Sequence, residues 1–129
     1  MASRWFNQFR LSLEKQVVDL WCNFTVGGIG APTLVSAASK GIKSVVRNSA
    51  GKYTITLSDS YYGFLQADIK ILNATAPAAP LNFVVSQAVT SSTTPVVVIQ
   101  FTNTAGAATD PGSGESVFLK VSLKNSSAY

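Results

Sequence analysis

The sequence has 129 residues, of which 47% are hydrophobic and only 12% are charged, with a formal net charge of +4. A typical soluble domain carries about 25% charged residues, so this chain has little charge with which to cover the surface of an ordinary monomer. The composition excludes intrinsic disorder and a long coiled coil, and the length fits one domain with a hydrophobic core.

The first sixteen residues allow two interpretations. Trp5, Phe6, Phe9 and Leu13 fall at helical spacing, which fits an amphipathic helix over residues 3–15. Leu11 and Leu13 fit equally well the beginning of a strand. We therefore treat residues 1–16 as an N-terminal arm, helical or extended, and residues 17–129 as the folded domain.

Short runs rich in β-branched residues follow, separated by clusters of Gly, Pro, Ser and Asn. Such a pattern is typical of an all-β sandwich or barrel. We predict a single β-sandwich of about seven strands, either jelly-roll-like or immunoglobulin-like. The predicted strands are 17–26, 42–47, 53–57, 64–72, 81–89, 96–101 and 117–123.

Alternation within these runs predicts which side chains face the core. In the first strand it places Leu20, Cys22 and Phe24 on one face and Trp21 on the other. Strands 42–47 and 53–57 are joined by a turn at 48–51 and form the clearest hairpin. The run 96–99 is apolar without a break, which predicts a strand in the interior of a sheet or one covered on both faces.

The ionisable residues argue against an enzyme. The chain has no histidine and only six acidic residues, which are scattered along it. The lone Cys22 cannot form an internal disulfide or a zinc site. Asp110 and Glu115 flank a glycine-rich turn of the kind that can bind calcium, but two carboxylates are few and we expect an ordinary turn. We predict no catalytic residue, no metal site and no cofactor.

Membrane and nucleic-acid partners are not expected. No apolar stretch approaches the ~20 residues that span a bilayer, and no continuous apolar region typical of a cleaved signal peptide follows the N-terminus. The ten basic residues are spread along the chain, whereas nucleic-acid binders usually cluster them. An attraction to an acidic partner surface remains open.

Aromatic residues concentrate near the N-terminus. We predict a partner-binding site formed by Trp5, Phe6, Phe9, Arg10 and Trp21, because large aromatics and Arg are the usual anchors of protein interfaces. In the alternative interpretation these aromatics fold back over the domain's own core. The two interpretations have equal weight on sequence grounds.

Four segments resemble small virion structural proteins of tailed bacteriophages, of the capsid decoration (cement) or head-fibre type. They are 3–9 (SRWFNQF), 18–24 (VDLWCNF), 41–47 (GIKSVVR) and 51–61 (GKYTITLSDSY). The resemblance implies a non-enzymatic β-rich module that forms a homo-oligomer, often a trimer. It further implies contact with the major capsid protein or a neighbouring virion protein, and a place in the virion after synthesis in the bacterial cytoplasm.

A second function remains open at this point. The chain fits a receptor- or carbohydrate-binding module of a phage fibre or tail, whose site would use Tyr61, Tyr62 and the loop 105–115.

Overall fold

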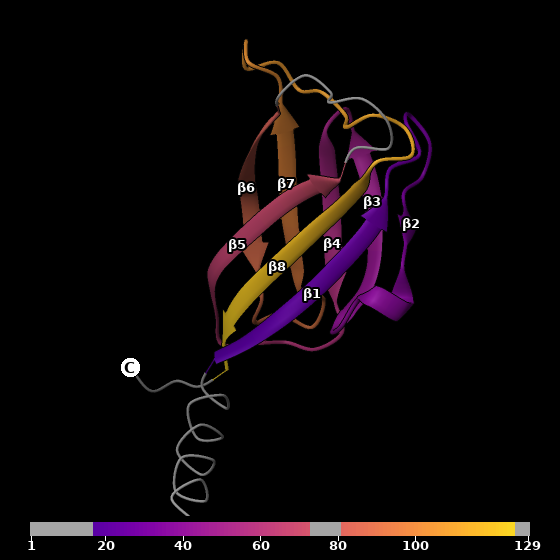
Figure 1. The fold of residues 1–129 in the computed structure, drawn as a ribbon. Helices are drawn as coiled ribbons and strands as arrows, with labels where there is room; N and C mark the ends of the chain where they lie inside the picture. Colours follow the sequence, from indigo (N-terminus) through magenta and orange to yellow (C-terminus); the bar gives the residue numbers. More distant parts are fainter. Residues whose placement is uncertain (1–16, 73–80, 126–129) are drawn as a thin grey trace, which may run out of the picture.

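The chain folds into two four-stranded antiparallel sheets packed face to face (Figure 1). The computed structural model describes residues 17–72 and 81–125. One sheet has the order β2-β1-β8-β5 and the other β3-β4-β7-β6. The elements are β1 (Val17–Thr25), β2 (Thr33–Leu34), the 3₁₀ turn η1 (Ser36–Ala38), β3 (Ile42–Ser49), β4 (Lys52–Leu57), β5 (Gly63–Leu72), β6 (Asn82–Val89), β7 (Val96–Thr102) and β8 (Ser116–Lys124).

The predicted β-sandwich is confirmed. The seven predicted strands correspond to β1 and β3 to β8, and β2 is an additional, two-residue strand. It pairs only with β1, through Phe24 opposite Leu34 and Thr25 opposite Thr33. So short a strand leaves no periodic signal in the sequence, because its extended shape comes from pairing with β1.

The core lies between the two sheets. Every second residue of β1, β4 and β8 points into it, as the alternation predicted, and Val97, Ile99 and Phe101 of β7 do so as well. Three rings pack in its centre: the centroids of Phe24 and Tyr53 are 5.4 Å apart, and those of Tyr53 and Phe101 are 5.9 Å apart. Such tilted and edge-on pairs add stabilisation beyond the burial of their area.

The sequence of β5 alternates, with Phe64, Gln66 and Asp68 on one face and Leu65, Ala67, Ile69 and Ile71 on the other, and this predicted alternation is wrong at the beginning of the strand. The register against β8 shifts between Phe64 and Gln66. Phe64 packs against the core, whereas Leu65 lies about half exposed. A bulge of this kind places two residues opposite one on the partner strand, after which Ile69 is buried as predicted.

The apolar run 96–99 forms most of β7, which pairs with β4 on one side and β6 on the other. This confirms its predicted place in the interior of a sheet. Val97 and Ile99 are buried in the core. Val98 points to the outer face but is only 5% exposed, because the neighbouring strands flank it on both sides.

Within the ranges 17–72 and 81–125, no helix is long and apolar enough to cross a membrane. The predicted arm, residues 1–16, lies outside the described residues.

Candidate interaction faces

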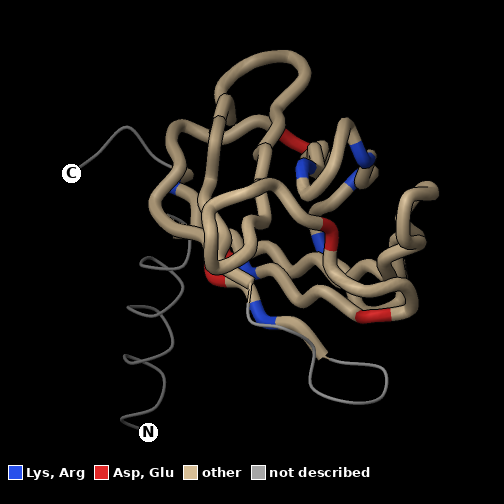
Figure 2. Tube along the Cα trace, turned by 90° about the horizontal axis from the view of Figure 1, so that it is seen from above, with Lys and Arg blue, Asp and Glu red and all other residues tan. Residues whose placement is uncertain are grey.

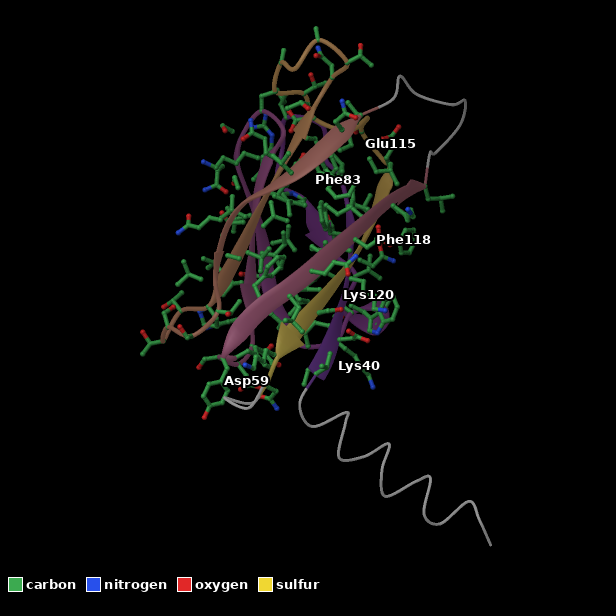
Figure 3. All side chains as sticks on the ribbon, turned by 90° about the vertical axis from the view of Figure 1, so that its left-hand side faces the viewer. Lys40, Asp59, Phe83, Glu115, Phe118 and Lys120 are labelled. Atoms are coloured by element: carbon green, nitrogen blue, oxygen red, sulfur yellow. The ribbon has the colours of Figure 1, made fainter. Side chains whose placement is uncertain are left out.

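The outer face of the β2-β1-β8-β5 sheet carries two exposed aromatic residues among charged ones. Strand register places Trp21 of β1 opposite Lys120 of β8, and Lys120 opposite Asp68 of β5. In the next row Phe118 lies beside Lys70. We call these five residues the tryptophan face. Phe118 and Lys120 project from the same side of the molecule (Figure 3).

Local contacts position the Trp21 ring. The Lys120 ammonium lies 5.2 Å from the ring centroid, a cation–π distance. The same ammonium is 3.6 Å from Asp19 Oδ2, and Asp19 Oδ1 accepts a 2.6 Å hydrogen bond from the Ser122 hydroxyl. Trp21 is nevertheless 51% exposed. Exposed ion pairs contribute little to stability, so these charges shape the surface of the sandwich more than they stabilise it.

The chain segment after η1 borders this face. The Lys40 amide donates a 2.7 Å hydrogen bond to the Trp21 carbonyl, and the Trp21 amide donates one of 3.3 Å in return. The Asn23 amide donates to the Ser39 hydroxyl at 3.0 Å. Between this segment and β5 lies a hollow of about 340 Å³. It is lined by Trp21, Cys22, Ala38, Asp68, Lys70, Phe118, Leu119 and Lys120.

Of the predicted partner-binding residues, Trp21 is described, and its outward direction is confirmed. Trp5, Phe6, Phe9 and Arg10 lie outside the described residues. Sequence reasoning missed Phe118. The signal was present, because Phe118 alternates with Val117 and Leu119, which face the core. An aromatic ring at an outward position of a strand marks an interaction surface.

The outer face of the other sheet differs, because it is formed mainly by valine and threonine. Three cross-strand rows follow from the register. The first is Ser44-Thr56-Val96-Val89, the second Val46-Thr54-Val98-Gln87, and the third Ser49-Lys52-Gln100-Val84. We call these rows the valine face. Lys52, at its margin, is the one charged residue in them, and charged residues are few along the described trace as a whole (Figure 2).

The two carboxylates of the 110–115 turn are both engaged within the chain. Asp110 accepts from Arg47 Nε at 3.0 Å and Nη2 at 2.7 Å, from the Gly51 amide and from the Tyr53 hydroxyl. These hydrogen bonds, that of Arg47 first, lower the pKa of Asp110. Glu115 accepts from the Gly112 amide at 2.9 Å. The ordinary turn expected there is therefore formed, held by contacts within the protein.

The predicted receptor site of Tyr61, Tyr62 and the loop 105–115 is wrong as one site. The Tyr62 amide donates to the carbonyl of Lys124, at the end of β8, whereas the loop ends where β8 begins. Nine residues at about 3.3 Å each separate the two ends of that strand. The tyrosines instead line a hollow of about 240 Å³ together with Ser60 and Ser91.

Comparison with known protein families, with curated proteins and with solved structures found no match. Among residues 17–72 and 81–125, no three His, Cys, Asp or Glu side chains are grouped so that they could hold a metal ion.

Proposed function

We propose that this chain is a non-enzymatic structural protein of a bacteriophage virion. It decorates or cements the capsid as a homo-oligomer, for which the sequence resemblance implies a trimer. It binds the major capsid protein or a neighbouring virion protein, and it is made in the cytoplasm of the host bacterium before it joins the particle.

The observation that carries this proposal is the exposed Trp21 on the outer face of the β2-β1-β8-β5 sheet. A half-exposed tryptophan beside Phe118 is costly to leave in water, and aromatic side chains are typical anchors of interfaces. Lys70 and Lys120 flank the rings. The tryptophan face can therefore bind acidic as well as apolar groups on a partner.

The test is an add-back assay with phage particles that lack this chain. The purified protein should co-sediment with the particles, and Trp21→Ala or Phe118→Ala should lower its binding at least tenfold. Tyr62→Ala is the matched control, because Tyr62 is 66% exposed and lies outside the tryptophan face. Failure of the unmodified protein to bind, or equal loss with Tyr62→Ala, would overturn the proposal.

A second candidate is a carbohydrate-binding module, favoured by the hollow beside Trp21. Its volume of about 340 Å³ lies at the lower end of the range for small-ligand sites. Sugar rings stack their C–H faces on aromatic rings, and Asp68 and Lys70 offer an acceptor and a donor for hydroxyl groups. Glycan-array signals that disappear with Trp21→Ala would support this function. An array without signals would contradict it.

A further inference from the structure

We propose that the valine face is the surface through which copies of this chain contact one another. The inference rests on the homo-oligomer of the proposed function and assigns it to one face of the fold. Because a face that meets its own copy forms a twofold contact, the unit it builds is a dimer in place of the trimer that the resemblance implies. The tryptophan face then binds the major capsid protein or a neighbouring virion protein. The two outer faces of one sandwich would thus bind different partners.

Several valine side chains of the valine face are exposed to solvent. Val46 and Val84 are 52% and 54% exposed, and Val89 is 38% exposed. They lie on three of the outer rows, around the nearly buried Val98. An antiparallel sheet with one face in water normally alternates apolar inward residues with polar outward ones. Here valine occupies several of the outward positions, which indicates that another protein surface covers this face.

The charged side chains on the two outer faces indicate which partner covers the valine face. A surface that meets a second copy of itself brings like charges together, which is unfavourable. The three outer rows contain one charged side chain, Lys52 at the margin, and the exposed Lys43 lies at the β3 bulge beside the first row. The tryptophan face instead carries Asp68, Lys70 and Lys120 within two neighbouring rows. Fewer charged groups are buried when two valine faces meet than when two tryptophan faces meet, which favours a second copy of this chain as the partner of the valine face.

The area of the valine face determines how strongly two copies are expected to associate. Four strands about 4.8 Å apart and about six residues long give a footprint of roughly 19 by 20 Å. With side chains that stand out from the sheet, a pair of faces buries on the order of 1,000 Å², which is the lower limit for a specific interface. We therefore expect reversible association in the micromolar range, reinforced where several copies are held on one surface.

The test is sedimentation of the full chain at several concentrations. The unmodified protein should exceed the 13.6 kDa of one chain at tens of micromolar. Val84→Lys and Val46→Lys should remain at that mass, with far-UV spectra and melting curves that show a folded sandwich. Leu72→Lys is the matched control, because Leu72 is 61% exposed but lies on the other sheet. It should associate like the unmodified protein.

A labelling experiment keeps the inference testable where a lysine variant does not fold. Cys22 is buried, so Val46→Cys supplies the one accessible thiol among residues 17–72 and 81–125. Its reaction with a bulky maleimide should slow several-fold as the protein concentration rises, and that of Leu72→Cys should not. Association that survives both lysine variants would overturn this inference alone. An unmodified chain that stays monomeric would overturn the homo-oligomer as well.

Discussion

Arg47 and Asp110 are 63 residues apart in the chain, yet their side chains form a two-point ion pair with N–O distances of 3.0 and 2.7 Å. The same Asp110 carboxylate accepts hydrogen bonds of 2.9 Å from the Gly51 amide and from the Tyr53 hydroxyl. Four hydrogen bonds thus fasten the long loop before β8 to the β3–β4 hairpin. Both groups are mostly shielded from solvent, so the contact is stronger than an ordinary surface ion pair.

Replacing this carboxylate should destabilise the fold. Asp110→Asn removes the charge that Arg47 faces and weakens the bonds to Gly51 and Tyr53. We expect a loss of about 1.5–3 kcal/mol in the free energy of unfolding, the range for hydrogen bonds to a charged group. Urea unfolding measures it. Asp59→Asn, at an exposed position, should change stability by less than about 0.5 kcal/mol. Equal effects of the two variants would contradict this role for Asp110.

The same contact predicts how stability depends on pH. The hydrogen bond from Arg47, first among several causes, lowers the pKa of Asp110 below its ordinary 3.8. In acid the unfolded chain therefore binds a proton at Asp110 before the folded chain does, and stability falls as the pH decreases. The contribution is complete above pH 3.8 and is lost as the pH falls through the lower pKa of the folded state. Melting temperatures between pH 5 and pH 2 should fall less steeply for Asp110→Asn. An unchanged slope would argue against this linkage.

Gly51 occupies a position at which any side chain is strained. Its φ is +69°, and an added Cβ would lie 2.5 Å from the Phe101 carbonyl oxygen and 2.8 Å from that of Thr109. Gly51→Ala should therefore cost more than the roughly 1–2 kcal/mol of a left-handed backbone alone. Gly106→Ala is the control, because Gly106 has a φ of +85° but no atom within 4 Å of the added Cβ. Chemical denaturation of the two variants compares them. Similar losses would show that the close approach at Gly51 is unimportant.

Cys22 should be inert in the folded protein. It is 2% exposed, and burial raises the pKa of its thiol to about 12. The thiolate is the reactive form, so an aromatic disulfide reagent at pH 8 should not modify the native chain. Addition of denaturant should release one thiol per chain. Rapid modification under native conditions would mean that β1 opens readily.

The strands could be predicted from the sequence because each carries its own signal. Alternation in Tyr53, Ile55 and Leu57 reports burial every second residue, and the turn at 48–51 marks where the hairpin reverses. The bulge at Leu65 could not be predicted, since it arises from the pairing of β5 with β8. The strands could therefore be predicted from alternation in the local sequence, whereas the bulge depends on pairing between strands that are far apart in the sequence.

The candidate faces were less accessible to sequence reasoning. Trp21 was identified as an anchor, but its neighbours Lys120 and Asp68 join it only through strand register. The predicted receptor site of Tyr61, Tyr62 and the loop 105–115 was wrong because strand order, which the sequence does not show, places the tyrosines and the loop at opposite ends of β8. The contacts of the predicted arm, 1–16, stay a prediction.

The most direct test of the proposed virion role is a cryo-electron microscopy map of density-banded virus particles from cells that produce this chain. The account predicts an eight-stranded sandwich on the capsid, with Trp21 and Phe118 against another virion protein and the valine face against a second copy. Peptide mass spectrometry of the same band should detect the chain at a fixed ratio to the major capsid protein. Particles that lack both the density and the peptides would contradict the assignment to the virion.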